Sequence, residues 1–128
     1  MDKLYIPGDL VSVYVGVKKY IVEVIGTENE NEVLLYQIKF PNGEIQYADK
    51  DNIVPIPLTP EILEKNGWAK DKEGYINDSY HLHLCGKYDG YSVYKVVNDN
   101  VVWLTGIRNV SDLQHLLFGL GINHEMEV

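Results

Sequence analysis

The chain has 128 residues, of which 45% are hydrophobic and 23% are charged, and its formal net charge is −8. This balance is typical of a folded globular protein, and the length fits one ordinary domain or two very small ones. The negative charge is shared evenly between the two halves, so neither half has the basic surface that nucleic-acid phosphates require, and we do not expect direct DNA or RNA binding.

The first half, residues 8–56, has the pattern of a run of short strands. The strongest turn signal is Asn42-Gly43, which supplies the positive φ angles of a tight hairpin, and a polar loop is expected at 26–31 and a turn at 49–52. The expected strands are 9–15, 19–25, 32–40, 44–48 and 53–55. Five short strands with a turn before the last predict a small antiparallel β-barrel, and the pattern resembles Src-homology-3-like barrels in fold alone.

The segment Pro55-Ile56-Pro57-Leu58-Thr59-Pro60 divides the chain. Its three prolines prevent a continuous strand or helix. Thr59 is suited to cap the N-terminus of a helix over 61–66, and Gly67 is suited to end that helix. We therefore expect two units, a small β-barrel over 1–56 and an α-β-β-β-α unit over 57–128.

The second unit continues with three apolar strands and a final helix. The strands are expected at 80–85, 91–97 and 101–107, separated by turn residues. Ser111 and Gln114 are spaced as a capping box for the last helix, which Gly121 closes. This order predicts an α+β protein whose helices cover one face of an antiparallel sheet.

The chain has an unusual excess of tyrosine over phenylalanine, with ten tyrosines and two phenylalanines. Tyrosine suits half-buried sheet surfaces, so the excess indicates either thin cores or a tyrosine-rich binding face. Trp68 follows a helix end and Trp103 lies in an apolar strand. We predict that both tryptophans are core anchors, because large aromatic side chains dominate burial in small domains.

His81, His83 and Cys85 form the cluster that most resembles a site. Side chains two apart on a strand share a face, and imidazole and thiolate groups are ligands that zinc accepts. This cluster is the basis of one functional hypothesis, a small metal-dependent enzyme. The other interpretation, which we favour, places Leu82 and Leu84 in the core and both histidines in solvent, with Cys85 a partly buried structural cysteine.

No other catalytic, cofactor or phosphate-binding pattern stands out, and no carboxylate pair suggests acid–base chemistry. We therefore expect no enzyme activity and no cofactor. Cys85 is the single cysteine, so an intrachain disulfide is excluded. The first residues lack the apolar run of a signal peptide, and no stretch approaches a membrane span, so we expect a cytoplasmic protein.

Two segments carry a family resemblance. Residues 55–68 read Pro-Ile-Pro-Leu-Thr-Pro-Glu-Ile-Leu-Glu-Lys-Asn-Gly-Trp, and residues 110–121 keep the pattern Val-x-x-Leu-Gln-x-Leu-x-x-x-Leu-Gly. Together they resemble a group of small Bacteroidetes proteins without an assigned activity, many of them carried on prophages and other mobile elements. The pattern departs from the group at Ser111, Leu117 and Gly119. The resemblance covers about residues 55–122 and implies no catalytic residue.

Two hypotheses follow for the function. The first is a non-enzymatic interaction module of bacterial or prophage origin that binds a protein through the tyrosine-rich barrel or an exposed strand face. The alternative is the metal-dependent enzyme that uses His81, His83 and Cys85. The sequence leaves the oligomeric state open, and an assembly whose function lies in the oligomer is a third possibility.

Overall fold

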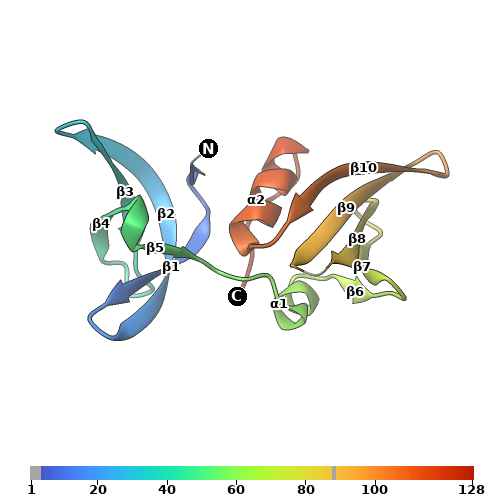
Figure 1. Ribbon diagram of the computed structural model, residues 1–128, viewed down its shortest axis with the longest axis horizontal. Coiled ribbons are helices and arrows are strands. Elements are labelled where there is room, and N and C mark those ends of the chain that lie inside the picture. The colour runs from blue at the N-terminus through green and yellow to red at the C-terminus, as the bar shows by residue number, and fades with distance from the viewer. Residues whose placement is uncertain (1–3, 88) are drawn as a thin grey trace.

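The computed structural model describes residues 4–87 and 89–128. These residues form two five-stranded antiparallel sheets, one in each half of the chain, and two α-helices beside the second sheet (Figure 1). The predicted α+β class is confirmed. Among the described residues, no helix has both the length and the apolar character needed to cross a membrane.

The first sheet has the strand order β4-β3-β2-β1-β5. Its elements are β1 (Leu10–Val15), β2 (Lys18–Glu30), β3 (Val33–Lys39), β4 (Ile45–Asp49), the 3₁₀ helix η1 (Lys50–Asn52) and β5 (Ile53–Pro55). The hairpin at Asn42-Gly43 is confirmed, with Gly43 at φ 91° and its N–H donating to the Phe40 carbonyl at 2.9 Å. Asp49 caps η1 by accepting hydrogen bonds from the amides of Asp51 and Asn52.

The polar loop predicted at 26–31 is wrong, because β2 continues through most of it and pairs with β3 as far as Glu30. Strand pairing is made by backbone groups and needs no apolar side chains. Because this end of the β2–β3 hairpin lies in solvent, polar residues can form strands there. The chain turns instead at Asn31 and Glu32, which both adopt positive φ as a two-residue hairpin requires.

The core of the first half lies on one face of its sheet. The buried cluster consists of Tyr5, Val11, Val13, Val22, Val24, Tyr36, Ile38, Phe40 and Ile53. The predicted closed barrel is not found: among the described residues the edge strands β4 and β5 do not pair with each other. β5 has three residues and ends at Pro55, which has no N–H to donate, so it offers little for closing the sheet.

The junction after β5 pairs with the segment that precedes the last helix. The Leu58 N–H donates to the Arg108 carbonyl at 3.0 Å, and the Val110 N–H donates to the Ile56 carbonyl at 2.8 Å. Helix α1 (Pro60–Lys65) then begins as predicted, with Thr59 Oγ1 accepting from the Ile62 amide. The prolines therefore end the first sheet, and the residues between them are fixed to the second half.

The second sheet has the strand order β10-β9-β8-β7-β6. Its strands are β6 (Ala69–Lys70), β7 (Gly74–Asn77), β8 (Leu82–Lys87), β9 (Gly90–Val97) and β10 (Asn100–Ile107), followed by helix α2 (Val110–Gly119). Three strands were predicted, and β6 and β7 extend the sheet to five. The predicted cap of α2 is also wrong, because Asn109 and Asp112 form the capping box while Ser111 and Gln114 are buried within the helix.

Helices α1 and α2 pack against one face of the second sheet (Figure 1). The core between them is formed by Ile56, Leu58, Leu63, Trp68, Tyr75, Leu82, Leu84, Val93, Ile107, Val110, Leu113 and Leu117. Trp68 is 3% exposed and is confirmed as a core residue. Leu10 of β1 also packs on this cluster, so the first sheet contacts the second half through β1 and α2.

Candidate functional site

The second sheet has one face covered by the helices and one open face, and successive residues of β8 point alternately to the two. Leu82 and Leu84 are buried against the helices, whereas His83 and Cys85 point to the other side and are half-buried. The interpretation that places both leucines in the core is confirmed. Because the helices lie on the leucine side, the opposite side of the sheet is the face on which functional side chains can be presented.

Four residues cross the open face in one row, which we call the aromatic row. Ile76, His83, Tyr94 and Trp103 are direct cross-strand partners in turn, on β7, β8, β9 and β10. Directly opposed side chains lie about 5 Å apart, so they form a continuous ridge. The row is half-buried at His83 and Tyr94 and ends at Trp103, which is 56% exposed.

A second row beside it consists of small residues. Gly74, Cys85, Ser92 and Gly106 are cross-strand partners on the same four strands, and Cys85 and Ser92 point to the same side of the sheet as the aromatic row. These side chains are much shorter than those of the aromatic row. The open face is therefore stepped, with an aromatic ridge beside a strip of small residues that the side chains of Glu73 and Lys87 border.

The prediction that Trp103 is a core residue is wrong. Its strand is apolar on both sides, so the sequence gives no alternation from which the buried side could be chosen. β10 is an edge strand, and Trp103 lies opposite Tyr94 on the face that the helices leave uncovered. In the sequence, the residue that would indicate this exposure is Tyr94, which pairs with Trp103 across β9 and β10. Tyr94 can be recognised as that partner only when the strand register is known.

The predicted trio is not assembled as a metal site. His81 lies outside β8, in a turn at φ 55°, and is exposed, while His83 and Cys85 stay on the open face. Across residues 4–87 and 89–128, no group of three or more histidine, cysteine, aspartate or glutamate side chains is arranged to hold a metal ion. His83 is therefore better described as part of the aromatic row.

Cys85 lies in an environment that disfavours its thiolate. Partial burial raises the pKa of the Cys85 thiol, and the Glu73 carboxylate, whose Oε2 accepts from Sγ at 3.8 Å, raises this pKa further. Asp71 acts in the same direction. A nucleophilic cysteine needs a lowered pKa, so this arrangement opposes covalent catalysis.

Alkylation of Cys85 by iodoacetamide at pH 7 is expected to be several-fold slower than alkylation of a free cysteine, because its thiolate fraction is smaller. The rate is expected to rise with pH through a midpoint above that of an ordinary thiol. The Glu73→Gln variant removes one negative charge and should react faster than the original chain at the same pH. A rate equal to that of free cysteine would contradict the assigned environment.

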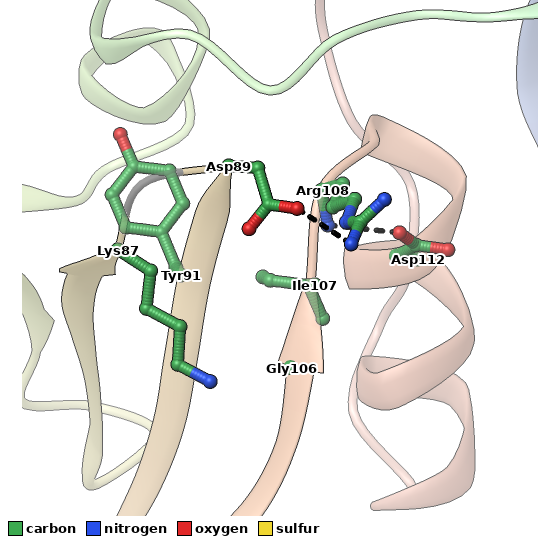
Figure 2. A pocket seen from close by; sticks show the side chains of 7 residues that line it. All are labelled: Lys87, Asp89, Tyr91, Gly106, Ile107, Arg108 and Asp112. Carbon is green, nitrogen blue, oxygen red and sulfur yellow. Dashed lines mark hydrogen bonds and ion pairs between the residues drawn. The ribbon is translucent and has the colours of Figure 1, made fainter.

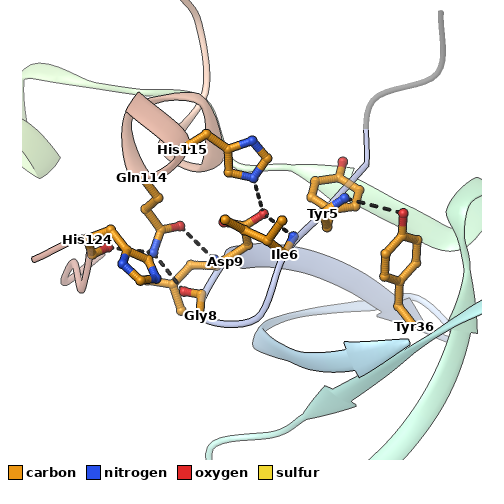
Figure 3. Close-up of polar contacts among 9 residues, drawn as sticks. Tyr5, Ile6, Gly8, Asp9, Tyr36, Gln114, His115 and His124 are labelled. Atoms are coloured by element: carbon orange, nitrogen blue, oxygen red, sulfur yellow. Dashed lines mark hydrogen bonds and ion pairs between the residues drawn. The ribbon is translucent and has the colours of Figure 1, made fainter. Parts of the chain in front are cut away.

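A second polar cluster joins the two halves (Figure 3). Gln114 of α2 is fully buried: its Oε1 accepts from the Leu10 N–H at 2.8 Å, and its Nε2 donates to the carbonyls of Gly8 at 2.8 Å and His124 at 3.0 Å. The neighbouring His115 places Nε2 2.5 Å from Oδ2 of Asp9, which is also fully buried. This cluster fixes the first strand to the last helix.

The cluster has an Asp–His pair, but among the described residues no accessible hydroxyl or thiol is hydrogen-bonded to the imidazole. Ser111, one helical turn before His115, is buried, and among the described residues its hydroxyl has no hydrogen-bond partner. Burial raises the pKa of the nearby Tyr5 phenol, and Tyr36 and Asp9 raise it further, so the phenol stays protonated. A catalytic triad needs an accessible hydroxyl within reach of the imidazole, and the hydrogen bonds of this cluster instead connect the first strand to the last helix.

A cleft of about 370 Å³ lies between the end of the β8–β9 hairpin and the start of α2 (Figure 2). Arg108 pairs with Asp89 at 2.6 Å, and both side chains are more than half exposed. The Arg108 amide donates to Asp112, the residue that caps α2. Lys87 is a second cation at this cleft, and Asp89 and Asp112 place carboxylates beside the arginine and at the helix start, so the lining is mixed in charge.

The sequence contains no signal for the polar cluster between the halves, because residues 8–10 on one side and 114–115 on the other lie more than 100 positions apart. Gln114 matched a capping pattern instead. No family model matches the chain, and the searches of curated proteins and of solved structures gave no match. The resemblance of residues 55–122 to small Bacteroidetes proteins therefore stays a prediction.

Proposed function

We propose that the chain is a non-enzymatic protein-interaction module that binds a protein partner with the open face of its second sheet. The observation that carries this proposal is the aromatic row, which ends in a tryptophan that is 56% exposed. Exposed aromatic side chains in a continuous group are typical of interaction sites, because their burial contributes most of the binding free energy.

The charge of the face favours a protein over a nucleic acid. The aromatic row contains no lysine or arginine, Lys87 lies beside the strip of small residues at Gly106, where Glu73 adds a carboxylate at Cys85, and the chain as a whole has a net charge of −8. Base stacking on aromatic residues requires cations nearby for the phosphates. A protein segment with apolar side chains requires none, and the stepped shape gives it a ridge to pack against.

The proposal extends to the first half and to the origin of the chain. We propose that the first sheet is a small Src-homology-3-like unit, supported by its strand order β4-β3-β2-β1-β5 and by the 3₁₀ turn between β4 and β5. We also propose a bacterial or prophage origin and a cytoplasmic location. In this arrangement the first sheet supports α2, and the second sheet presents the binding face.

The experiment compares immobilised wild-type chain with the Tyr94→Ser variant in a lysate of cells that express the protein. Tyr94 lies in the middle of the aromatic row. A partner retained by the wild-type chain is then purified, and its affinity is measured by calorimetry. Loss of an interface tyrosine costs about 1.4 kcal/mol or more, so we expect binding to weaken about tenfold or more.

The matched control is Tyr14→Ser. Tyr14 is 56% exposed and lies on the first sheet, so its loss removes the same side chain from a different surface. Both variants must give the circular dichroism spectrum of the wild-type chain. A partner that binds the Tyr94→Ser variant as tightly as the wild type would place the interaction elsewhere, and recovery of no specific partner would count against the module.

A further inference from the structure

We infer that two copies of this chain associate by pairing their β10 strands edge to edge, so that the second sheet continues from one copy into the other. The segment that pairs is Asn100–Trp103, which we call the arm strand. The inference goes beyond the proposed function, because it concerns the free edge of the sheet: of the aromatic row it engages only Trp103, and it leaves Ile76, His83 and Tyr94 to the proposed protein partner.

The arm strand is a free edge with apolar side chains on both sides. In the described sheet β10 has a neighbour on one side only, so one row of its backbone N–H and C=O groups is unpaired. Val101 and Trp103 are 61% and 56% exposed on the open face, and Val102 is 48% exposed on the other face. Figure 1 shows the β9–β10 turn projecting away from α2.

The other edge strands of the described sheets are shorter than β10, and each of them contains a charged residue or a proline. β6 has two residues, one of them Lys70, β5 has three and ends in Pro55, and β4 has five and ends in Asp49. β10 has eight residues, Asn-Val-Val-Trp-Leu-Thr-Gly-Ile, with neither a charge nor a proline. Monomeric proteins protect long edges with such residues or with bulges, and the part of β10 before its irregularity at Trp103–Thr105 has none of these, which indicates an edge that is paired in the functional state.

The arm strand is complementary to a second copy of itself. In an antiparallel pair with a two-fold axis at Val102, Val102 of each copy meets Val102 of the other, and Val101 of each copy meets the other Trp103. Residues opposite each other point to the same face, so Trp103 packs on a β-branched side chain, which is a favourable cross-strand pair. Every exposed apolar side chain of the arm strand is then covered.

This register also keeps the acidic residues of the two copies apart. Two chains of net charge −8 repel, so their contact must avoid opposed carboxylates. The acidic residue nearest to the arm strand, Asp99, lies three residues before Val102, so the two copies of Asp99 are separated by six residues, or about 20 Å. That distance exceeds the screening length of about 8 Å at physiological salt.

A contact of this length is shorter than a standard interface. The backbone irregularity between Trp103 and Thr105 ends the regular segment, so pairing is limited to the arm strand and its immediate neighbours. Small interfaces are weak, and the association is therefore expected to depend on concentration. On the neighbouring strand β9, Lys95 lies beside Val102. In the pair, the two copies of Lys95 are separated by three strand spacings, or about 14 Å.

Sedimentation equilibrium over a series from micromolar to near-millimolar chain tests this pairing. The wild-type mass is expected to rise towards twice that of one chain. The Val102→Lys variant places two ammonium groups opposite each other and is expected to remain a single chain throughout, as is Val102→Glu. An equimolar mixture of the two variants should recover dimers, because opposite charges then meet at the axis.

The control is Val17→Lys, which adds the same charge at a turn residue that is 98% exposed, and it should dimerise like the wild type. A wild-type chain that stays monomeric throughout the series overturns the inference, as does a Val102→Lys variant that still dimerises. A mixture that stays monomeric overturns the register. Dimers that Tyr94→Ser abolishes and Val102→Lys keeps would show that the copies stack through the open face instead.

Discussion

The Gln114→Ala variant is expected to lose about 3 kcal/mol of unfolding free energy. Gln114 is fully buried and satisfies three backbone groups, the Leu10 N–H and the carbonyls of Gly8 and His124. Removing the amide leaves these groups unpaired at the contact between the halves, and each unpaired buried group costs about 1–3 kcal/mol. Urea denaturation followed by circular dichroism measures the change.

The matched control for this variant is Gln46→Ala. Gln46 lies on the exposed surface of β4, where its Nε2 donates to Glu44 at 2.9 Å. The same truncation there should change the unfolding free energy by no more than about 0.5 kcal/mol. If both variants were equally stable, the amide of Gln114 would not be what fixes the first strand to α2.

The Gly74→Ala variant is expected to lose about 3 kcal/mol or more. A Cβ at position 74 would lie 1.9 Å from the carbonyl oxygen of Leu84 and 3.2 Å from Cα of Cys85. These atoms belong to the backbone of the paired strand, so they cannot move aside without separating β7 from β8. Because β7 carries Ile76 of the aromatic row, the variant should also lose the proposed binding.

Gly86→Ala is the control for this second prediction. It makes the same change in the same sheet, but the nearest atom to its Cβ is the Glu73 carbonyl oxygen at 3.7 Å, which is ordinary contact. The variant is expected to be as stable as the wild type or slightly more stable, because alanine reduces the freedom of the unfolded chain. Thermal denaturation of both variants side by side distinguishes a clash at position 74 from a general loss of glycine.

The two stability predictions concern different contacts that the open face depends on. Gln114 ties α2 to the first sheet, and α2 in turn covers the face of the second sheet opposite to the aromatic row. Gly74 keeps β7 close to β8, which holds His83 in register with Ile76. Loss of binding in either variant must therefore be compared with its loss of stability before the aromatic row is held responsible.

Local sequence patterns predicted the parts of the fold that short-range chemistry controls. Thr59 caps α1, Gly43 turns the β3–β4 hairpin, and the alternation at Leu82 to Cys85 separates a buried face from an open one. Each of these features depends on residues within a few positions of one another. The candidate face could be predicted only in part, since His83 and Cys85 were recognised while Tyr94 was not.

Other features depended on contacts that the sequence does not encode locally. Trp103 is exposed because β10 is an edge strand, and its apolar neighbours on both sides conceal that fact. Ser111 and Gln114 fit a capping pattern, yet Asn109, two residues before Ser111, caps the helix, and the amide of Gln114 bonds instead to Leu10 and Gly8. A local pattern cannot decide between such alternatives, because the competing partner lies on a distant strand.

By itself, the sequence determined that the chain is acidic and has a β-rich first half, a proline junction and a second half that begins with a helix capped by Thr59. The junction at Pro55 to Pro60 is determined by residue type, since proline restricts the backbone wherever it occurs. Only the tertiary structure decided that Ile76, His83, Tyr94 and Trp103 form one row, because strand order and register arise from packing over the whole sheet. The same packing leaves the edge of β10 free.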